Sequence, residues 1–154
     1  ISDSTAIVSY IDAKYPEVPL IPVDPANRAR AVWFDEFADT ILTAAAGPIF
    51  FNRIVSPKFI GKPGDDAAAA KGEADMIPVC QYLESVIRPS GYLVGDSLTL
   101  ADISVASPFV NAAHAGHVPA AATYPKLTAY LAAIHARPSF SDWIRRERKM
   151  LGLG

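Results

Sequence analysis

The spacing of apolar residues is the feature that most constrains the fold of this chain, because it is helical almost everywhere. Ile7, Tyr10 and Ile11, for example, recur at the three-then-four step that marks one face of a helix. No segment alternates apolar and polar residues as a half-buried strand would, and the short run 92–95 fits a buried hinge before a helix equally well. The pattern therefore predicts an all-α fold whose antiparallel neighbours are joined by short loops.

Prolines and capping residues set the expected helix ends. Four prolines between Pro16 and Pro25 exclude a helix there and predict an extended linker. Asp24 suits an N-cap with Pro25 at the first helical position. Gly47-Pro48 either kinks or ends the helix that follows, and a loop is expected over 56–66. The other predicted helices cover roughly 3–14, 65–87, 99–116, 125–136 and 139–150.

Composition excludes several classes of protein. The chain has 154 residues, a net charge of -2 and one cysteine, so clustered cationic charge for nucleic acid and a disulfide framework are both lacking. No uncharged apolar run reaches about 18 residues, which predicts a cytoplasmic protein without a membrane span. Because the first residue is Ile1 and not methionine, the chain is expected to be a piece of a longer protein.

The segment around residue 100 carries the strongest local signal. Thr99 and Asp102 have the spacing of a capping box, with aspartate in place of the usual glutamate. Leu98 and Ile103 occupy the two positions of a hydrophobic staple around that box. The residues that follow are apolar on all sides, so this helix is expected to lie at the centre of the bundle.

Together with its flanks, this segment resembles the helical C-terminal domain of glutathione transferases. The resemblance rests on the string 92–102, on Tyr124-Pro125-Lys126-Leu127 with Arg137-Pro138-Ser139-Phe140, which is similar to bacterial members, and on the stretch 24–29. It spans essentially the whole chain. It implies that residues 1–15 form the last helix of a thioredoxin-like domain, residues 16–25 a linker, and residues 26–154 the helical domain.

The resemblance also gives Asp3 and Ser4 a role in binding the γ-glutamyl end of glutathione. A helix N-terminus and a serine hydroxyl suit its carboxylate, and an aspartate suits its ammonium group. The alternative is that these residues only cap a helix, and both roles are compatible. The thiol-activating Ser, Tyr or Cys of the family would precede residue 1, so no catalytic residue is expected in this chain.

Other candidate residues have simpler explanations. Phe37 shares helical spacing with Ile41, which favours a core position. In the family this helix lines the pocket for the hydrophobic co-substrate and also meets the partner subunit. Trp33 and Phe37 are therefore candidates for the pocket, and for Trp33 the interface or neither place is the alternative. His114 and His117 lie three residues apart, but no partner ligand is near in sequence and no metal site is expected. Cys80 lies on an apolar stripe, which favours a buried structural thiol.

The resemblance implies a homodimeric enzyme that conjugates the glutathione thiolate to hydrophobic electrophiles, with no metal. This chain alone is expected to be inactive. Isomerase or dehalogenase chemistry on the same scaffold is left open by the sequence. The alternative from another class is a non-catalytic module for protein interaction or regulation, because the same helical domain serves such proteins too.

Overall fold

The chain folds into helices joined by turns and loops. The computed structural model describes residues 1–153 and contains no strand within that range. The elements are α1 (Ser4–Lys14), α2 (Pro25–Phe37), the π-helical η1 (Ala38–Leu42), α3 (Thr43–Phe50), the π-helical η2 (Phe51–Ile60), α4 (Asp66–Val86), α5 (Leu100–His114), α6 (Pro125–His135) and α7 (Pro138–Leu151). The predicted all-α class is confirmed.

Side-chain caps fix the starts of four helices where the sequence predicts them. Asp3, Asp24 and Asp65 each accept a hydrogen bond from the backbone N–H three residues on. Thr99 and Asp102 form the predicted capping box at the start of α5. These caps satisfy amides that have no acceptor inside the first turn of a helix.

The prediction of a loop over 56–66 is wrong for residues 56–60, whereas the helix at Gly47-Pro48, expected either to kink or to end, continues. The helical path does not end at Gly47-Pro48, and the expected loop from Ser56 begins only at Gly61, whose φ of 71° closes the helix in the left-handed conformation. Pro57 lies inside η2. A wider π-type turn accommodates a residue that cannot donate to the helix ladder, so the helical path continues through Pro57.

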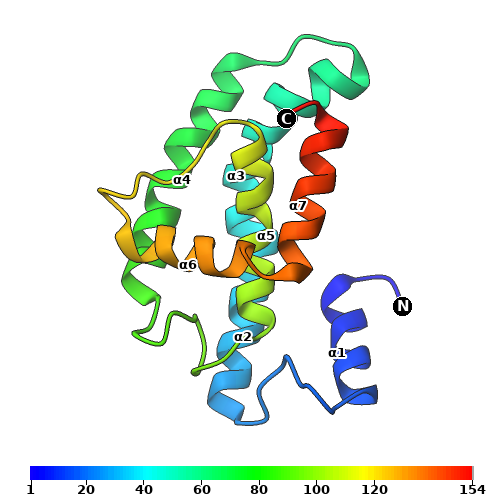
Figure 1. Cartoon of the computed structure of the whole chain (residues 1–154), viewed down its shortest axis with the longest axis vertical. Coiled ribbons are helices and arrows are strands. Elements are labelled where there is room, and N and C mark those ends of the chain that lie inside the picture. The colour runs from blue at the N-terminus through cyan, green and yellow to red at the C-terminus, as the bar shows by residue number, and fades with distance from the viewer. Residues whose placement is uncertain (154) are drawn as a thin grey trace.

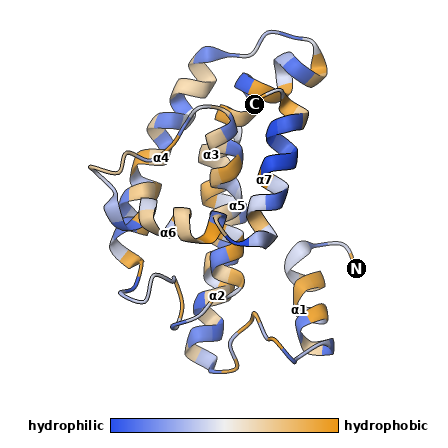
Figure 2. Ribbon diagram, viewed as in Figure 1, coloured by the Kyte–Doolittle hydropathy of each residue, from blue (hydrophilic) through white to orange (hydrophobic). Residues whose placement is uncertain are grey.

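The core surrounds α5, which passes between α3 and α7 with α6 crossing beside it (Figure 1). Ala101, Val105 and Ala106 of this helix are fully buried. Gly72 of α4 lets that helix approach α3 closely, because an added Cβ would meet the Ala45 carbonyl oxygen at 2.8 Å. By contrast, α7 presents mostly hydrophilic residues (Figure 2). Within residues 1–153, no helix combines the length and apolarity that a membrane span requires.

Helix α1 lies at the margin of this body and buries no residue. The Asp12 carboxylate accepts hydrogen bonds from the N–H groups of Leu20 (2.6 Å) and Ile21 (3.3 Å), which folds the linker back along the helix. The carbonyl of Leu20 in turn accepts from the N–H of Leu100, at the start of α5. Polar contacts rather than apolar packing therefore hold α1 against the core.

The pH dependence of stability should carry a contribution from His135. Its Nε2 contacts the Ala106 carbonyl oxygen at 2.9 Å, and burial lowers the pKa of His135 despite that contact. The unfolded chain, with a pKa near 6.5, therefore takes up the proton first. The stabilisation is complete above about pH 6.5 and is lost as the pH falls towards the lower folded pKa.

Replacing His135 with glutamine should remove this contribution. Urea unfolding of the native chain and of His135→Gln at pH 8 and pH 5.5 should show that the native chain loses more stability on acidification. Other titrating groups are common to both proteins and cancel in the difference. Parallel pH profiles would show that His135 makes no such contribution.

Candidate functional site

The N-terminus of α1 gathers polar groups from two parts of the chain. Asp3 caps the helix through Oδ1, which accepts from the N–H of Ala6 at 3.0 Å. Ser4 Oγ lies 3.5 Å from Asp39 Oδ2, so η1 places a second carboxylate beside the first turn. Asp3 also adopts φ 113° and ψ 124°, and within residues 1–153 it is the one non-glycine residue with positive φ. Such outliers gather at ligand clamps and switches.

Asp35 connects this helix start to the core. Its side chain is 6% exposed and accepts hydrogen bonds from two hydroxyl groups: Thr5 Oγ1 donates to Oδ2 at 2.7 Å, and Ser104 Oγ donates to Oδ1 at 2.6 Å. One buried carboxylate on α2 thus joins α1 to α5. Because Thr5 directly follows Ser4, Asp35 fixes the position of the predicted γ-glutamyl anchor.

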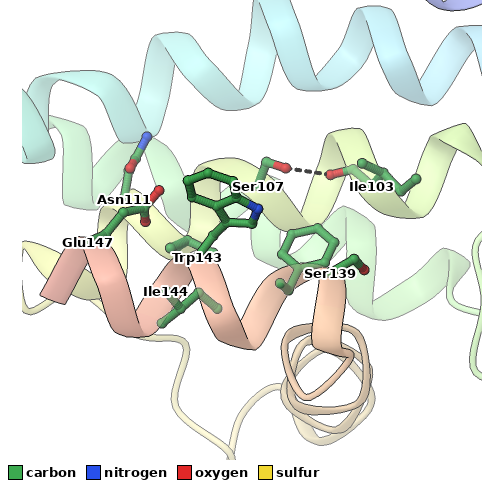
Figure 3. Close-up of a pocket in the computed structure, with 9 residues that line it drawn as sticks. Ile103, Ser107, Asn111, Ser139, Trp143, Ile144 and Glu147 are labelled. Carbon is green, nitrogen blue, oxygen red and sulfur yellow. Dashed lines mark hydrogen bonds between the residues drawn. The ribbon is translucent and has the colours of Figure 1, made fainter.

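Two adjoining hollows lie along α5, from Ile103 towards the C-terminal end of the helix. The larger, about 370 Å³, lies between α5 and α7 and begins at Ile103, next to Ser104. The smaller, about 170 Å³, lies between α3 and α5, and Ser107 and Asn111 line both. Figure 3 shows Trp143 reaching from α7 across the larger hollow. The walls are mainly apolar with a few polar groups, as in sites for small organic ligands.

Polar contacts brace the far end of the larger hollow. Glu147 Oε2 lies 3.0 Å from Nε2 of the buried His114. Trp143 is 58% exposed, and the Arg146 guanidinium lies 4.9 Å from the centre of its ring. The hollow thus presents a broad aromatic surface next to a carboxylate.

Of the two residues that the sequence offers for the substrate pocket, Phe37 lines a different groove, and Trp33 lies beside that groove in contact with Tyr82. Phe37 is buried in its floor, and Trp33 is 50% exposed and donates from Nε1 to the hydroxyl of Tyr82 at 3.3 Å. The rings of Tyr82 and Phe37 pack with their centres 5.3 Å apart and their planes inclined by 48°. This groove, about 580 Å³, is lined by residues of α2, η1, α3 and α4. It does not share a residue with the hollows along α5.

The capping box fixes the start of α5, the helix that carries Ile103 and Ser104. Asp102 is fully buried, and its carboxylate accepts from the N–H of Leu93 at 3.0 Å and of Thr99 at 2.9 Å. Burial raises the pKa of Asp102, and these hydrogen bonds lower it in part. Burial, and secondarily the Asp102 charge, raises the pKa of Tyr130 well above its usual value. Leu98 and Ile103, the predicted staple residues, are both partly buried.

The two histidines that share helical spacing reach different partners. His114 contacts Glu147, whereas Nδ1 of His117 lies 3.4 Å from Glu73 on α4. Glu73 also bonds Arg53 at 2.7 Å, and that bond is the main cause of its lowered pKa. Within residues 1–153, no three His, Cys, Asp or Glu side chains group as metal ligands would. Cys80 is buried, as predicted, and burial raises its pKa to about 11.

Sequence reasoning missed several residues of this region. Asp35 and Asp39 lie four residues apart on one helix, and this shared face was a signal that could have found them. Phe140, Trp143 and Ile144 form an apolar stripe on an otherwise charged helix, which also marks a face turned towards a partner. Ser104 gave no signal, because a serine in a helix has many possible partners.

Comparison of the sequence with known proteins identifies the family of this chain. Residues 55–147 match the family described as "Glutathione S-transferase, C-terminal domain". A glutathione S-transferase from Hyoscyamus muticus is 34% identical over 146 residues, which cover 92% of this chain and 68% of that protein.

Solved structures agree in fold. The crystal structure of a glutathione S-transferase from Rhodospirillum rubrum F11 superposes with a TM-score of 0.82 at 27% identity, covering 91% of this chain and 63% of that one. The structure of glutathione S-transferase-I bound with the ligand lactoylglutathione gives a TM-score of 0.80 at 26% identity, covering 92% and 68%. The chain spans about two thirds of the length of these relatives. It therefore belongs to the glutathione S-transferase family and carries the C-terminal helical domain of that family.

Proposed function

We propose that this chain is the C-terminal portion of a glutathione transferase that conjugates the glutathione thiolate to hydrophobic electrophiles. Residues 1–15 are the last helix of a thioredoxin-like domain, residues 16–25 a linker, and residues 26–154 the helical domain. Two observations support this division. The relatives are longer than this chain, and α1 exposes Ile7, Tyr10 and Ile11 by 40%, 52% and 48%. An 11-residue helix that buries none of its apolar side chains is marginal by itself and needs a further partner.

The observation that carries the proposal is the polar cluster at the start of α1. First-turn N–H groups have no acceptor within a helix, so those of Ser4 and Thr5 can bind the γ-glutamyl carboxylate. The Ser4 hydroxyl adds a donor, and its long 3.5 Å contact with Asp39 is easily exchanged for a ligand oxygen. The carboxylates of Asp39, which contacts Ser4, and of Asp3, which precedes it, suit the ammonium group.

The electrophile needs an apolar wall near the sulfur of glutathione. The hollows along α5 are suited to this, because they begin beside Ser104, which Asp35 links to the helix that holds the anchor. Phe37 lies instead in the groove towards α4, and Trp33 lies beside that groove. We therefore assign the electrophile to the walls formed by Phe50 and Trp143.

The chemistry at the sulfur needs a group outside this chain. A free thiol with a pKa near 8.5 is mostly protonated at neutral pH, and a hydrogen bond to the thiolate increases the ionised fraction. The residues here bind and orient glutathione and keep an apolar space for the electrophile. They do not supply that hydrogen bond, so the isolated chain should not turn over.

Steady-state conjugation of glutathione to a chromogenic aryl halide tests the proposal. The parent protein should be active and residues 1–154 alone inactive. Ser4→Ala in the parent should raise the KM for glutathione about 10-fold or more with little change in kcat, because a hydrogen bond to a charged ligand contributes about 1.5–3 kcal/mol. Ser9→Ala, another exposed serine on α1, is the matched control. A parent that neither reacts with nor binds glutathione would leave the non-catalytic module as the better description.

We also propose that the protein forms a homodimer through the groove between α2 and α4. Trp33, Ile41 and Tyr82 are 50%, 46% and 36% exposed around the buried Phe37. A contiguous apolar surface of this kind marks a protein contact more often than free surface. Sedimentation velocity should show that Ile41→Glu converts dimer to monomer. Ile60→Glu, at 49% exposure outside the groove, should leave the dimer intact, and a dimer that survives Ile41→Glu would place the interface elsewhere.

A further inference from the structure

The surface formed by the end of η2 and the last turns of α7 concentrates the positive charge of the chain. Segments 58–62 and 145–149 hold six of the 14 lysine and arginine residues, although the whole chain has a net charge of -2. The same segments hold one acidic residue, Glu147, whose carboxylate contacts the buried His114. The cations that form this basic face are Lys58, Lys62, Arg145, Arg146, Arg148 and Lys149.

Each of the two segments is short by itself, and the fold brings them together. Lys58 Nζ donates to the Leu151 carbonyl oxygen at 2.6 Å, which holds the end of η2 against the end of α7. In Figure 1 the red end of α7 accordingly reaches the teal helix over 51–60. Helix α7 lies on the opposite side of α5 from α4 in that view, so the basic face lies away from the groove proposed for the dimer.

Large apolar side chains are exposed among these cations. Trp143, Arg146 and Met150 are spaced three and four residues apart, so they follow one stripe along α7. Met150 is 69% exposed, and the Arg146 guanidinium lies over the ring of the exposed Trp143. Phe59, next to Lys58 on η2, is 59% exposed. Exposed apolar side chains that alternate with cations are typical of a surface that meets an amphipathic, anionic partner.

The cations of the basic face differ in how far other groups engage them. Arg145 lies 3.0 Å from Asp142, and Arg148 donates to a backbone carbonyl oxygen near the end of the chain. Among residues 1–153, no carboxylate oxygen lies within 4.0 Å of the side-chain nitrogen atoms of Arg146 or Lys149. These two cations, which lie on or beside the apolar stripe, are therefore the most available to an anionic ligand.

We propose that the basic face docks the protein on the surface of an anionic phospholipid bilayer, without spanning it and independently of the function proposed above. Trp143, Met150 and Phe59 enter the headgroup region, and Arg146 and Lys149 pair with lipid phosphates. A tryptophan ring is stable at that depth, and basic side chains reach the phosphates while their apolar stems stay buried. Anionic lipids attract such cations, and the buried apolar area adds to the binding. A nucleic acid would pair with the cations but leave Met150 and Phe59 in water, so the bilayer matches this surface better.

Co-sedimentation of the chain with lipid vesicles measures the docking. Binding should be saturable on vesicles that contain phosphatidylserine and about 10-fold weaker or less on phosphatidylcholine alone. Arg146→Glu and Lys149→Glu should each weaken binding about 10-fold or more, because one basic residue near an anionic surface contributes about fivefold and the reversal changes two charges. Arg30→Glu, the same change at an exposed residue of α2, is the matched control and should weaken binding less than about 3-fold.

Tryptophan fluorescence tests whether the apolar side chains enter the bilayer. The chain has two tryptophans, so Trp33→Phe leaves Trp143 as the single one. Its emission should shift to the blue on phosphatidylserine vesicles, and Met150→Ser should weaken binding about 3- to 10-fold. Equal binding to both kinds of vesicle, unchanged affinity in Arg146→Glu, or an unshifted Trp143 emission would overturn the proposal. So would tighter binding to an RNA or DNA oligonucleotide than to the vesicles.

Discussion

Replacing Asp102 with alanine is expected to lower the free energy of unfolding by about 3 kcal/mol. Loss of an N-cap costs about 0.5–2 kcal/mol, and a buried donor without a partner costs about 1–3 kcal/mol. Asp102 is fully buried, and its removal leaves the N–H groups of Leu93 and Thr99 without acceptors. The free energy of unfolding of a domain of this size is about 5–15 kcal/mol, so a loss of about 3 kcal/mol is a large fraction of it.

Urea unfolding followed by circular dichroism measures this loss. Asp96→Ala is the matched control, because Asp96 lies in the same segment but is 83% exposed with one weak contact. It should change stability by less than about 0.5 kcal/mol. If Asp102→Ala matched that control, the buried carboxylate would not be what organises the start of α5.

Helix ends were predictable where a single side chain decides them. Asp24 and Asp65 each sit directly before a helical run and accept a backbone N–H three residues away, so the whole interaction is local. The same holds for the box formed by Thr99 and Asp102. Local interactions of this kind are visible in sequence, because both partners lie within one turn.

The continuous helical course of residues 38–60 could not be predicted from local signals. Gly47-Pro48 and Pro57 are stop signals by themselves, yet the helix continues, because tertiary packing outweighs them. Leu42 and Ile49 are fully buried against the neighbouring helices. The loop after the helix also contributes: a Cβ on Gly64 would lie 1.8 Å from the Asn52 carbonyl oxygen, so only glycine allows that approach.

In the candidate site, too, local interactions were predictable and long-range ones were not. The cap formed by Asp3 is local and therefore visible in sequence, and the ligand role proposed for Asp3 and Ser4 comes from the family resemblance. Asp35, Asp39 and Ser104 act across 30 or more residues of sequence. Trp143 joins the cleft only because α7 lies against α5. Contacts of this range depend on the tertiary arrangement, which a single sequence does not specify residue by residue.

Asp35→Ala should release α1 from the core. That helix buries no residue, so its docking depends on polar contacts such as the 2.7 Å bond from Thr5 to Asp35. Hydrogen exchange of amides 8–14 should accelerate 10- to 100-fold, which corresponds to about 1.4–2.8 kcal/mol. Asp39→Ala is the control, because its 3.5 Å contact with Ser4 is exposed, and it should change the rates less than 3-fold.

Two further variants separate the two bonds of Asp35. Thr5→Val removes the bond to α1 alone, so it should accelerate exchange in α1 and leave the slowest amides of α5 unchanged. Ser104→Ala removes the bond to α5 and should affect both helices less than Asp35→Ala does. In the Asp35→Ala background, Thr5→Val should add nothing, since its partner is already gone. Additive effects would mean that Thr5 holds α1 through another contact, and Asp35 would then not position the proposed glutathione anchor.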